Sequence, residues 1–431
     1  MRKTLWATAF LSIFWMRGVV SGAEFRAAVV KMDVTPADPQ PLVGYAPRIS
    51  RGINDRLYHR ILALDDGTTE FFLISSDFGS ISPAYHDSVA DRLARECGID
   101  PTCVWWTLTH THSAPELGPP GLLASFLGER FLKPFNADYA AYVERQLIKG
   151  VQDARAQLRP AMIGAAWGVS QANINRRARL TDGRTVLGMN PDGAVDRRIG
   201  LLRFEGMDGR TIALVANYPI HGTVMGSQNL LISGDVAGIV SAYVERKSGA
   251  PLLFINGAAG NLAPIYSGYA NPREGQLDQF EVLLGDRILK ANEAMGATTR
   301  DVKLQLDSIT VETPLKPGLK WPTELVSYAR QTAAGEQLVR IPIKFLRIND
   351  RLVVWSAPLE LFCEISNEIR ELSPFPYTFY FGYTNGWLGY LPTAEEFDHQ
   401  GYEPTVSPFT PAAPRDLLAA VSQYLHNQAS R

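Results

Sequence analysis

Residues 104–113 read Val-Trp-Trp-Thr-Leu-Thr-His-Thr-His-Ser, an apolar run that passes into two histidines. The run predicts a buried strand over Val104–His112. Because alternate side chains of a strand share a face, His110 and His112 are expected to point the same way as the apolar positions before them. Ligands of open α/β sheets gather beyond the carboxyl ends of strands, which makes this strand end a candidate site. Two close histidines are also common as hydrogen-bonded residues at the rim of a core.

Segments with strand character alternate with helical segments on both sides of this stretch. Further strands are predicted at Phe71–Ser75, Thr211–Asn217, Pro251–Asn256, Leu352–Ser356 and Thr378–Tyr383, and helices at Tyr85–Glu96, Tyr139–Leu158, Val236–Lys247, Gln279–Met295 and Glu360–Glu371. The alternation predicts an α/β fold in which a mixed β-sheet core is flanked by helices.

The chain of 431 residues is long enough for one large domain or two ordinary ones. No linker rich in Gly, Ser or Pro marks a boundary, so a single compact unit is expected over residues 24–431. Residues 317–340 carry prolines and modest hydrophobicity, which favours an insertion or an edge element. Asp235 directly precedes a predicted helix and is a plausible N-cap.

Residues 1–23 have the pattern of an export signal. Two basic residues open the chain, Leu5–Met16 is mostly apolar, and small residues follow at positions 21–23. Arg17 leaves the apolar run too short to span a bilayer, so a membrane anchor is the less favoured alternative. No later segment has a long enough uninterrupted apolar run to span a bilayer. The mature protein is therefore expected to be secreted or periplasmic.

Charge and cysteine content narrow the possible function classes. The formal net charge is −2, and it becomes −5 without residues 1–23, which hold three basic residues and no acids. No basic block is present, so nucleic acid is not expected as a partner. The three cysteines form no Cys-x-x-Cys, which excludes a cysteine zinc knuckle. Cys97 and Cys103 are close enough in sequence to pair outside the cytoplasm. The sequence indicates no oligomeric state.

Three more polar residues follow predicted strands by a few positions. His221 comes after TIALVAN, Glu360 after LVVWS, and Tyr390 after TFYFGY. If these strands are neighbours in one sheet, the three residues converge with the histidine pair at one edge. Two neutral imidazoles and a carboxylate are the usual ligands of catalytic zinc, and a fourth ligand or water completes the tetrahedron. Taken singly, Glu360 also suits a helix N-terminus, and Tyr390 also suits a packing aromatic.

A glycine-rich turn, Asn256–Asn261, follows another predicted strand. Its backbone N–H groups could approach an anion or a developing oxyanion, although a tight surface turn has the same composition. The turn is not a P-loop, because no Gly-Lys-Ser/Thr follows it. The chain lacks Gly-x-Ser-x-Gly and His-Glu-x-x-His, which argues against serine α/β-hydrolases and zincin proteases. No Asp stands two residues after His112, which argues against metallo-β-lactamases.

Taken in order, motifs over nearly the whole chain after residue 23 resemble the catalytic domain of the neutral (non-lysosomal) ceramidases. They are Asp33–Pro36 with Gly44-Tyr45, Asp55–Arg60, Thr109–Ser113, Asn175-Arg176, Asn217–Thr223, Leu231–Asp235, Pro358–Glu360, Asn385–Tyr390 with Pro392-Thr393, and Glu395–Glu403. The resemblance implies a zinc-dependent hydrolase that cleaves the amide bond of a ceramide-like N-acyl lipid in sphingolipid metabolism.

The resemblance also implies a role for each site residue. The expected zinc (Zn2+) ligands come from four separate segments: His110, His221, Glu360 and Tyr390. The expected catalytic residues are His112 beside the scissile bond, Arg176 orienting the substrate, and Tyr402 stabilising the developing oxyanion. A zinc-activated water would attack the amide carbonyl.

The sequence departs from the family's pattern in several places. Ala263 stands where the family has a serine, and Leu359 and Trp387 replace a glycine and a tyrosine. The stretch after Glu403 is expected to be too short for the immunoglobulin-like domain that the family usually has. Two alternatives to a ceramide-like amidase therefore stay open: a zinc esterase or lactonase acting on a smaller polar substrate, and a catalytically inactive binding homologue.

Overall fold

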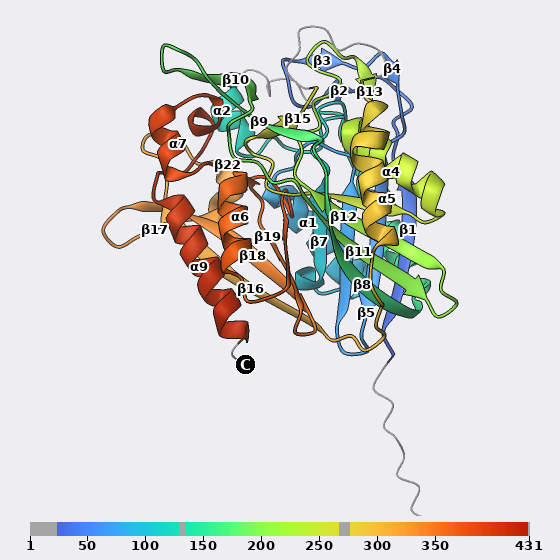
Figure 1. Cartoon of the computed structure of the whole chain (residues 1–431). Coiled ribbons are helices and arrows are strands. Elements are labelled where there is room, and N and C mark those ends of the chain that lie inside the picture. The colour runs from blue at the N-terminus through green and yellow to red at the C-terminus, as the bar shows by residue number, and fades with distance from the viewer. Residues whose placement is uncertain (1–23, 129–134, 267–275, 430–431) are drawn as a thin grey trace, which may run out of the picture.

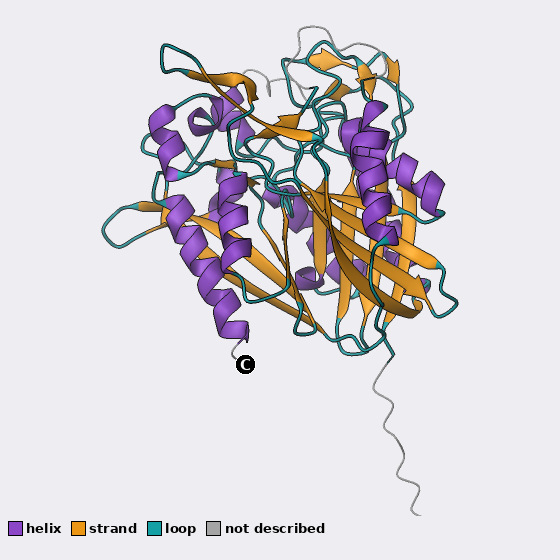
Figure 2. Ribbon diagram, viewed as in Figure 1, coloured by secondary structure: helices purple, strands orange, loops and turns teal. Residues whose placement is uncertain are grey.

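The computed structural model describes residues 24–128, 135–266 and 276–429 (Figure 1). The expected export signal, residues 1–23, lies outside the described residues. Two β-sheets pack against each other and helices cover their outer faces, so helices and sheets form four layers (Figure 2). This arrangement confirms the expected α/β class. In the described part of the chain, no helix combines the length and the apolar character needed to cross a bilayer.

The larger sheet has eight strands within the described residues and mixes parallel with antiparallel pairs. Its order from edge to edge is β14 (Leu252–Asn256), β12 (Thr211–Tyr218), β11 (Arg198–Gly206), β8 (Arg159–Val169), β1 (Arg26–Asp33), β5 (Tyr58–Asp65), β6 (Glu70–Ser76) and β7 (Val104–Leu108). Helix α3 (Ala137–Ala156) packs on β1 and β5, and α4 (Asp235–Ser248) and α5 (Asp286–Glu293) cover the other end of the same sheet. A π-helical turn, Glu281–Gly285, leads into α5.

The smaller sheet is built from the C-terminal third of the chain. It joins β16 (Leu304–Pro314), β18 (Gln337–Ile348), β19 (Leu352–Ser356) and β21 (Tyr377–Phe381), with β17 (Ala329–Gln331) paired to β18. Helices α6 (Cys363–Leu372) and α9 (Ala413–Ala429) lie together on its outer face (Figure 1). Residues 317–340 form a short 3-10 helix, Thr323–Tyr328, followed by β17 and the start of β18, as an edge element should.

Both sheets are buried on two faces, which explains their nearly continuous apolar strands. In β12, Val215 faces the core shared by the two sheets, whereas Leu214 packs in the cluster that contains α4 and α5. In β19, Val354 enters the shared core and Trp355 joins the cluster that contains α6 and α9. The alternation of a strand therefore assigns its side chains to two apolar layers.

The larger sheet curls until its two edge strands, β14 and β7, come together. Asn256, the last residue of β14, donates through Nδ2 to the Thr109 carbonyl at 3.2 Å. Ser75 of β6 donates through Oγ to the Phe254 carbonyl of β14 at 2.6 Å. This closure places the carboxyl end of β7 beside that of β12, although the two strands lie six positions apart in the sheet order. The ends of β7 and β12 meet because the sheet curls, and not because the two strands are adjacent in the sheet.

Short pairings complete the end of the molecule where the loops gather. They are β2 (Pro41–Leu42) with β3 (Arg48–Ile49), β4 (Gly52–Ile53) with β13 (Leu231–Ile232), β20 (Glu360–Leu361) with β22 (Tyr390–Leu391), and β10 (Thr185–Asn190) with β9 (Asn173–Arg179) and β15 (Leu262–Pro264). The short helices α2 (Leu123–Leu127), α7 (Ala394–His399) and α8 (Tyr402–Thr405) lie in the same region (Figure 1).

Several expected boundaries were wrong. β7 ends at Leu108 and does not run to His112, because His110 takes a left-handed backbone with φ 61° that turns the chain out of the sheet. Glu360 does not begin a helix, since it lies in β20 and α6 starts at Cys363. Helix α4 begins at Asp235 itself, which accepts the Val236 N–H.

The cysteines do not pair in the structure. Cys97, Cys103 and Cys363 are all free thiols. Cys97 accepts a hydrogen bond from Gln152 Nε2 at 3.3 Å, and burial raises the pKa of Cys103. The disulfide considered between Cys97 and Cys103 is therefore not formed here.

Candidate metal centre

His110 lies two residues beyond the end of β7, in the left-handed conformation that turns the chain out of the sheet. Its N–H donates to the Phe78 carbonyl at 2.9 Å, and its Nδ1 donates to the Gly79 carbonyl at 2.7 Å. A carbonyl can only accept, so the neutral ring carries its proton on Nδ1. Its Nε2 lone pair is therefore free to face the centre of the site.

His221 follows β12 and is oriented in the same manner. Its Nδ1 donates to the carbonyls of Ala259 and Leu262 at 2.8 and 3.0 Å. Ala259 belongs to the glycine-rich turn Asn256–Asn261. The turn thus contributes a carbonyl that orients an imidazole, and the approach of its N–H groups to an anion or oxyanion stays a prediction. Backbone acceptors of this kind set the tautomer of metal-binding histidines.

Glu360 brings a carboxylate to the two imidazoles from β20. Its Oε2 lies 3.1 Å from His221 Nε2 and 3.3 Å from His110 Nε2. Trp387 donates through Nε1 to the other oxygen at 2.7 Å, and Tyr383 donates through its hydroxyl to Oε2 at 3.2 Å. Tyr383 also stacks on the His110 ring at 4.3 Å between centroids.

Tyr390 reaches the same point because β22 pairs in parallel with β20, with Tyr390 opposite Glu360. Its hydroxyl lies 3.5 Å from His221 Nε2 and accepts a hydrogen bond from Arg176 at 3.1 Å. The four residues expected to bind a metal therefore meet, although they come from four different segments. All four side chains are buried.

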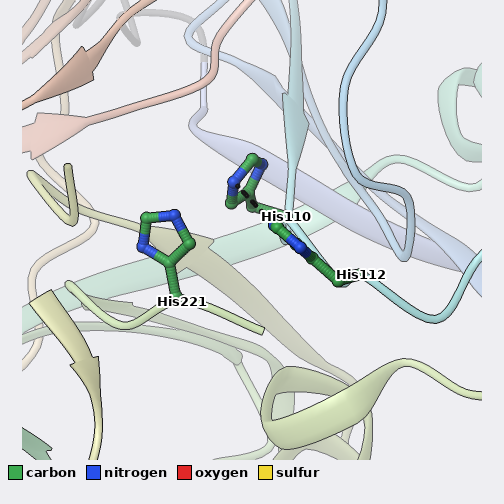
Figure 3. A group of neighbouring side chains, drawn as sticks. All are labelled: His110, His112 and His221. Carbon is green, nitrogen blue, oxygen red and sulfur yellow. Dashed lines mark hydrogen bonds between the residues drawn. The ribbon is translucent and has the colours of Figure 1, made fainter. Parts of the chain in front are cut away.

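His112 completes a cluster of three imidazoles (Figure 3). Its Nε2 lies 3.3 Å from His110 Nε2, and the ligand atoms of His110, His112 and His221 all lie within 4.8 Å of one another. The two rings meet across a turn that follows β7, and not along one face of a strand. Tyr45 packs edge-on to the His112 ring at 5.1 Å between centroids.

The charges of the site fit a bound cation. Burial, with the nearby Arg176, lowers the pKa of His221 to about 4, so this imidazole is neutral at pH 7. Burial also lowers the pKa of His112 well below its usual value. Burial alone would raise the pKa of Glu360, whereas His110 and His221, when they carry a proton on Nε2, lower it well below its ordinary range. An imidazole lone pair and an ionised carboxylate oxygen 3.1 Å apart repel each other, and a divalent cation between them removes this repulsion.

Arg176 and Arg177 of β9 extend the site through buried ion pairs. Arg176 Nε donates to Glu403 Oε1 at 2.8 Å, and Arg177 bonds both Glu403 and Glu396. Glu403 is fully enclosed, so this network fixes Arg176 beside Tyr390. Tyr402 lies next to Glu403 at the rim, with its ring centroid 5.8 Å from that of Tyr390.

Three contributors to the site received no role from the sequence: Tyr383, Trp387, which was noted only as replacing a tyrosine, and Glu403, which was noted only as part of a matching motif. Each is a hydrogen-bonding residue within a few positions of an expected site residue, and that proximity is the signal that points to them. Ala263, at the family's serine position, is buried in β15 and pairs with Ile174.

The family model described as "Neutral/alkaline non-lysosomal ceramidase, N-terminal" matches residues 25–259. Neutral ceramidase of Pseudomonas aeruginosa is 28% identical over 309 residues, which cover 66% of this chain and 44% of that protein. Neutral ceramidase of Mycobacterium tuberculosis is 29% identical over 224 residues, with 48% and 33% covered. Neutral ceramidase A of Dictyostelium discoideum is 31% identical over 150 residues, with 32% and 19% covered. The chain thus matches less than half the length of each of these relatives.

Solved structures show the same fold. A structure described as ceramidase complexed with C2 superposes with a TM-score of 0.75 at 21% identity, over 94% of this chain and 76% of that one. Neutral ceramidase from Pseudomonas aeruginosa superposes with a TM-score of 0.73 at 22% identity, over 94% and 74%.

Proposed function

The chain belongs to the neutral/alkaline non-lysosomal ceramidase family, and from this premise we propose that it is an exported, zinc-dependent hydrolase that cleaves the amide bond of a ceramide-like N-acyl lipid. The observation that carries the proposal is the meeting of two neutral-tautomer imidazole nitrogens with the Glu360 carboxylate, at 3.1 and 3.3 Å. Tyr390 offers a fourth ligand, its hydroxyl oxygen, beside them. Two histidines and a carboxylate form a usual catalytic zinc set.

His110, His221, Glu360 and Tyr390 would hold the metal. Zinc in this place supplies Lewis acidity, which polarises a carbonyl and makes water more acidic. His112 would accept a proton from the attacking water and deliver it to the leaving nitrogen. Two features support this role: burial lowers the pKa of His112, which favours the neutral imidazole that can accept a proton, and its Nδ1 has no hydrogen-bond partner among the described residues.

Arg176 and Tyr402 would position the substrate. Arg176 is held by Glu403 and Tyr390, so its guanidinium enters the site in one orientation. Tyr402 is 39% exposed at the rim, where its hydroxyl can meet an oxyanion. Water adds to the carbonyl and the carbon–nitrogen bond breaks, which leaves a carboxylic acid and an amine. Ala263 is consistent with this route because water, and not a serine, is the nucleophile.

The proposal is tested by measuring metal content and hydrolysis together. We expect about one zinc per purified chain, and hydrolysis of N-acyl-sphingosines in a panel that also holds short acyl esters and N-acyl sugars. His112→Ala should slow hydrolysis by about 10²–10⁴-fold with zinc retained. His110→Ala should lose both zinc and activity, whereas His426→Ala, on the exposed face of α9, should keep both.

Each other result points elsewhere. A His110→Ala variant that keeps metal and full activity would refute the proposed site. Turnover of esters alone would indicate the esterase or lactonase. Zinc binding without any turnover would indicate a binding homologue, which is the alternative that Ala263 motivates.

A further inference from the structure

The hairpin of β9 and β10 presents apolar side chains to solvent. Val186 and Leu187 of β10 are 36% and 54% exposed, and Leu180 and Met189 are exposed beside them. Consecutive residues of a strand point to opposite faces, so both faces of this hairpin are apolar. β10 is also the edge of its three-stranded sheet. Figure 1 shows the hairpin projecting from the end of the molecule where the loops gather.

The hairpin is continuous with the candidate metal centre. Leu187 pairs across the strands with Arg177, the neighbour of Arg176. On the other side, a Cβ atom on Gly401 would lie 3.1 Å from the Thr185 carbonyl at the start of β10, so the segment that leads into Tyr402 packs against the hairpin. The exposed side chain of Leu187 therefore lies on the residue paired with Arg177, which is the direct neighbour of Arg176.

The short strands β3, β4 and β13 lie at the same end of the molecule (Figure 1), and they carry a second set of exposed apolar residues. Ile49 of β3, Ile53 of β4 and Leu231 of β13 are exposed, and β4 pairs with β13. Arg48, directly before Ile49, donates to the His112 carbonyl at 2.7 Å. Each cluster is thus connected to the site through an arginine: Leu187 pairs with Arg177, and Ile49 directly follows Arg48.

We propose that these two clusters, the hairpin cluster (Leu180, Val186, Leu187, Met189) and the corner cluster (Ile49, Ile53, Leu231), dock the protein on a neutral lipid surface with the candidate site facing it. This inference rests on the proposed function, because an N-acyl lipid resides in such a surface. Exposed apolar patches beside a site mark interaction surfaces. A lipid layer covers both faces of an inserted hairpin, whereas a protein partner seated on one face leaves the other exposed.

The geometry and charge of the hairpin also predict how deeply it enters the lipid layer and which class of lipid it binds. Among the described strands β10 is the edge of its sheet, and edge backbone groups need hydrogen bonds, so the hairpin is expected to sit among headgroups and not in the hydrocarbon centre. The basic side chains of the hairpin are paired with acids, Arg179 with Glu396 and Arg184 with Asp182. Docking is therefore expected on zwitterionic lipid without a need for anionic headgroups.

The test is flotation of the full chain with phosphatidylcholine vesicles that contain no substrate. The double variant Val186→Ser with Leu187→Ser should lower the partition coefficient by about tenfold or more. The matched control, Val326→Ser with Leu372→Ser, alters two exposed aliphatic residues away from both clusters and should bind as the unaltered protein does. Leu187→Trp, which keeps an apolar side chain, should retain binding. Equal melting temperatures establish that each variant is folded.

Other outcomes overturn the inference. Vesicle binding that the hairpin double variant leaves unchanged, or that both double variants lose equally, contradicts docking through this face. A change of oligomeric state in the hairpin variant, without any vesicle binding, assigns the face to a second copy of the chain. His110→Ala should bind vesicles normally, so a failure of the proposed hydrolysis is seen separately from a failure of docking.

Discussion

The tautomers of two histidines set up the chemistry of the candidate centre. His110 and His221 each donate from Nδ1 to backbone carbonyls, which leaves both Nε2 atoms directed at Glu360. The carboxylate is held in turn by Trp387 on one oxygen and Tyr383 on the other. Partners of this kind raise ligand basicity and fix ligand orientation. The site is therefore prepared by residues outside the expected set of metal ligands.

Trp387 is expected to act as a positioning residue for Glu360. Trp387→Phe keeps an aromatic ring but removes the N–H that bonds Oε1 at 2.7 Å. Zinc affinity should fall by about 10–100-fold, as measured by competition with a chromogenic chelator. Trp167→Phe is the matched control. Trp167 also donates one hydrogen bond, in its case to the Pro376 carbonyl, but it lies on β8. Unchanged affinity in Trp387→Phe would show that Glu360 needs no such support.

At the scale of elements, the centre depends on loops that approach one another closely. Thr111 forms a bridge with Gly222, and the His112 N–H donates to the Gly222 carbonyl at 2.8 Å. A Cβ atom on Gly222 would lie 2.6 Å from Thr111 Cα. A Cβ atom on Gly260 would lie 2.5 Å from the Glu360 carbonyl. Glycine at both positions allows the loops that carry His110, His221 and Glu360 to pack together.

Gly222→Ala should separate the loops that carry His110 and His221. Backbone contacts cannot move aside easily, so we expect a loss of about 1–3 kcal/mol in the free energy of unfolding and weaker zinc binding. Urea denaturation and metal titration measure the two effects. Gly296→Ala serves as the control, since no atom lies within 4 Å of its added Cβ. Equal effects of the two substitutions would contradict the role given to the Gly222 contact.

At the scale of the whole molecule, a buried polar residue links the layers. His59 of β5 is fully enclosed, with Nδ1 2.6 Å from Ser76 Oγ and Nε2 3.2 Å from the Val143 carbonyl of α3. The Ser76 hydroxyl also accepts the Trp106 indole N–H of β7. One imidazole therefore joins the larger sheet to the helix that covers it. Its burial lowers the pKa of His59 to about 4.

This depressed pKa predicts acid sensitivity of the fold. Below about pH 6.5 the unfolded chain protonates at His59 while the folded chain does not, so protons favour unfolding. The free energy of unfolding should fall between about pH 6.5 and 4, with up to about 3 kcal/mol from this residue. Urea denaturation at several pH values measures the slope, which His59→Gln should flatten. His426→Gln, on the exposed face of α9, should leave the slope unchanged.

Local pattern was a good guide to the type of most elements and a poorer guide to their ends. The strand at Leu352–Ser356 was predicted with its observed bounds, because its apolar run stops where the chain leaves the sheet. The strand predicted to reach His112 stops at Leu108, because the left-handed backbone of His110 turns the chain away from the sheet. Nothing near Trp387 in the sequence indicates that its N–H reaches a carboxylate 27 positions earlier.

The sequence by itself determined the α/β alternation and which side chains could bind a metal, because periodicity and residue chemistry are local properties. Only the tertiary structure decided that those side chains meet. The meeting depends on the curl that brings β14 against β7, on the parallel pairing of β20 with β22, and on glycine contacts between loops. These pairings join segments more than a hundred residues apart in some cases, and backbone hydrogen bonds of that range leave no periodic mark in the chain.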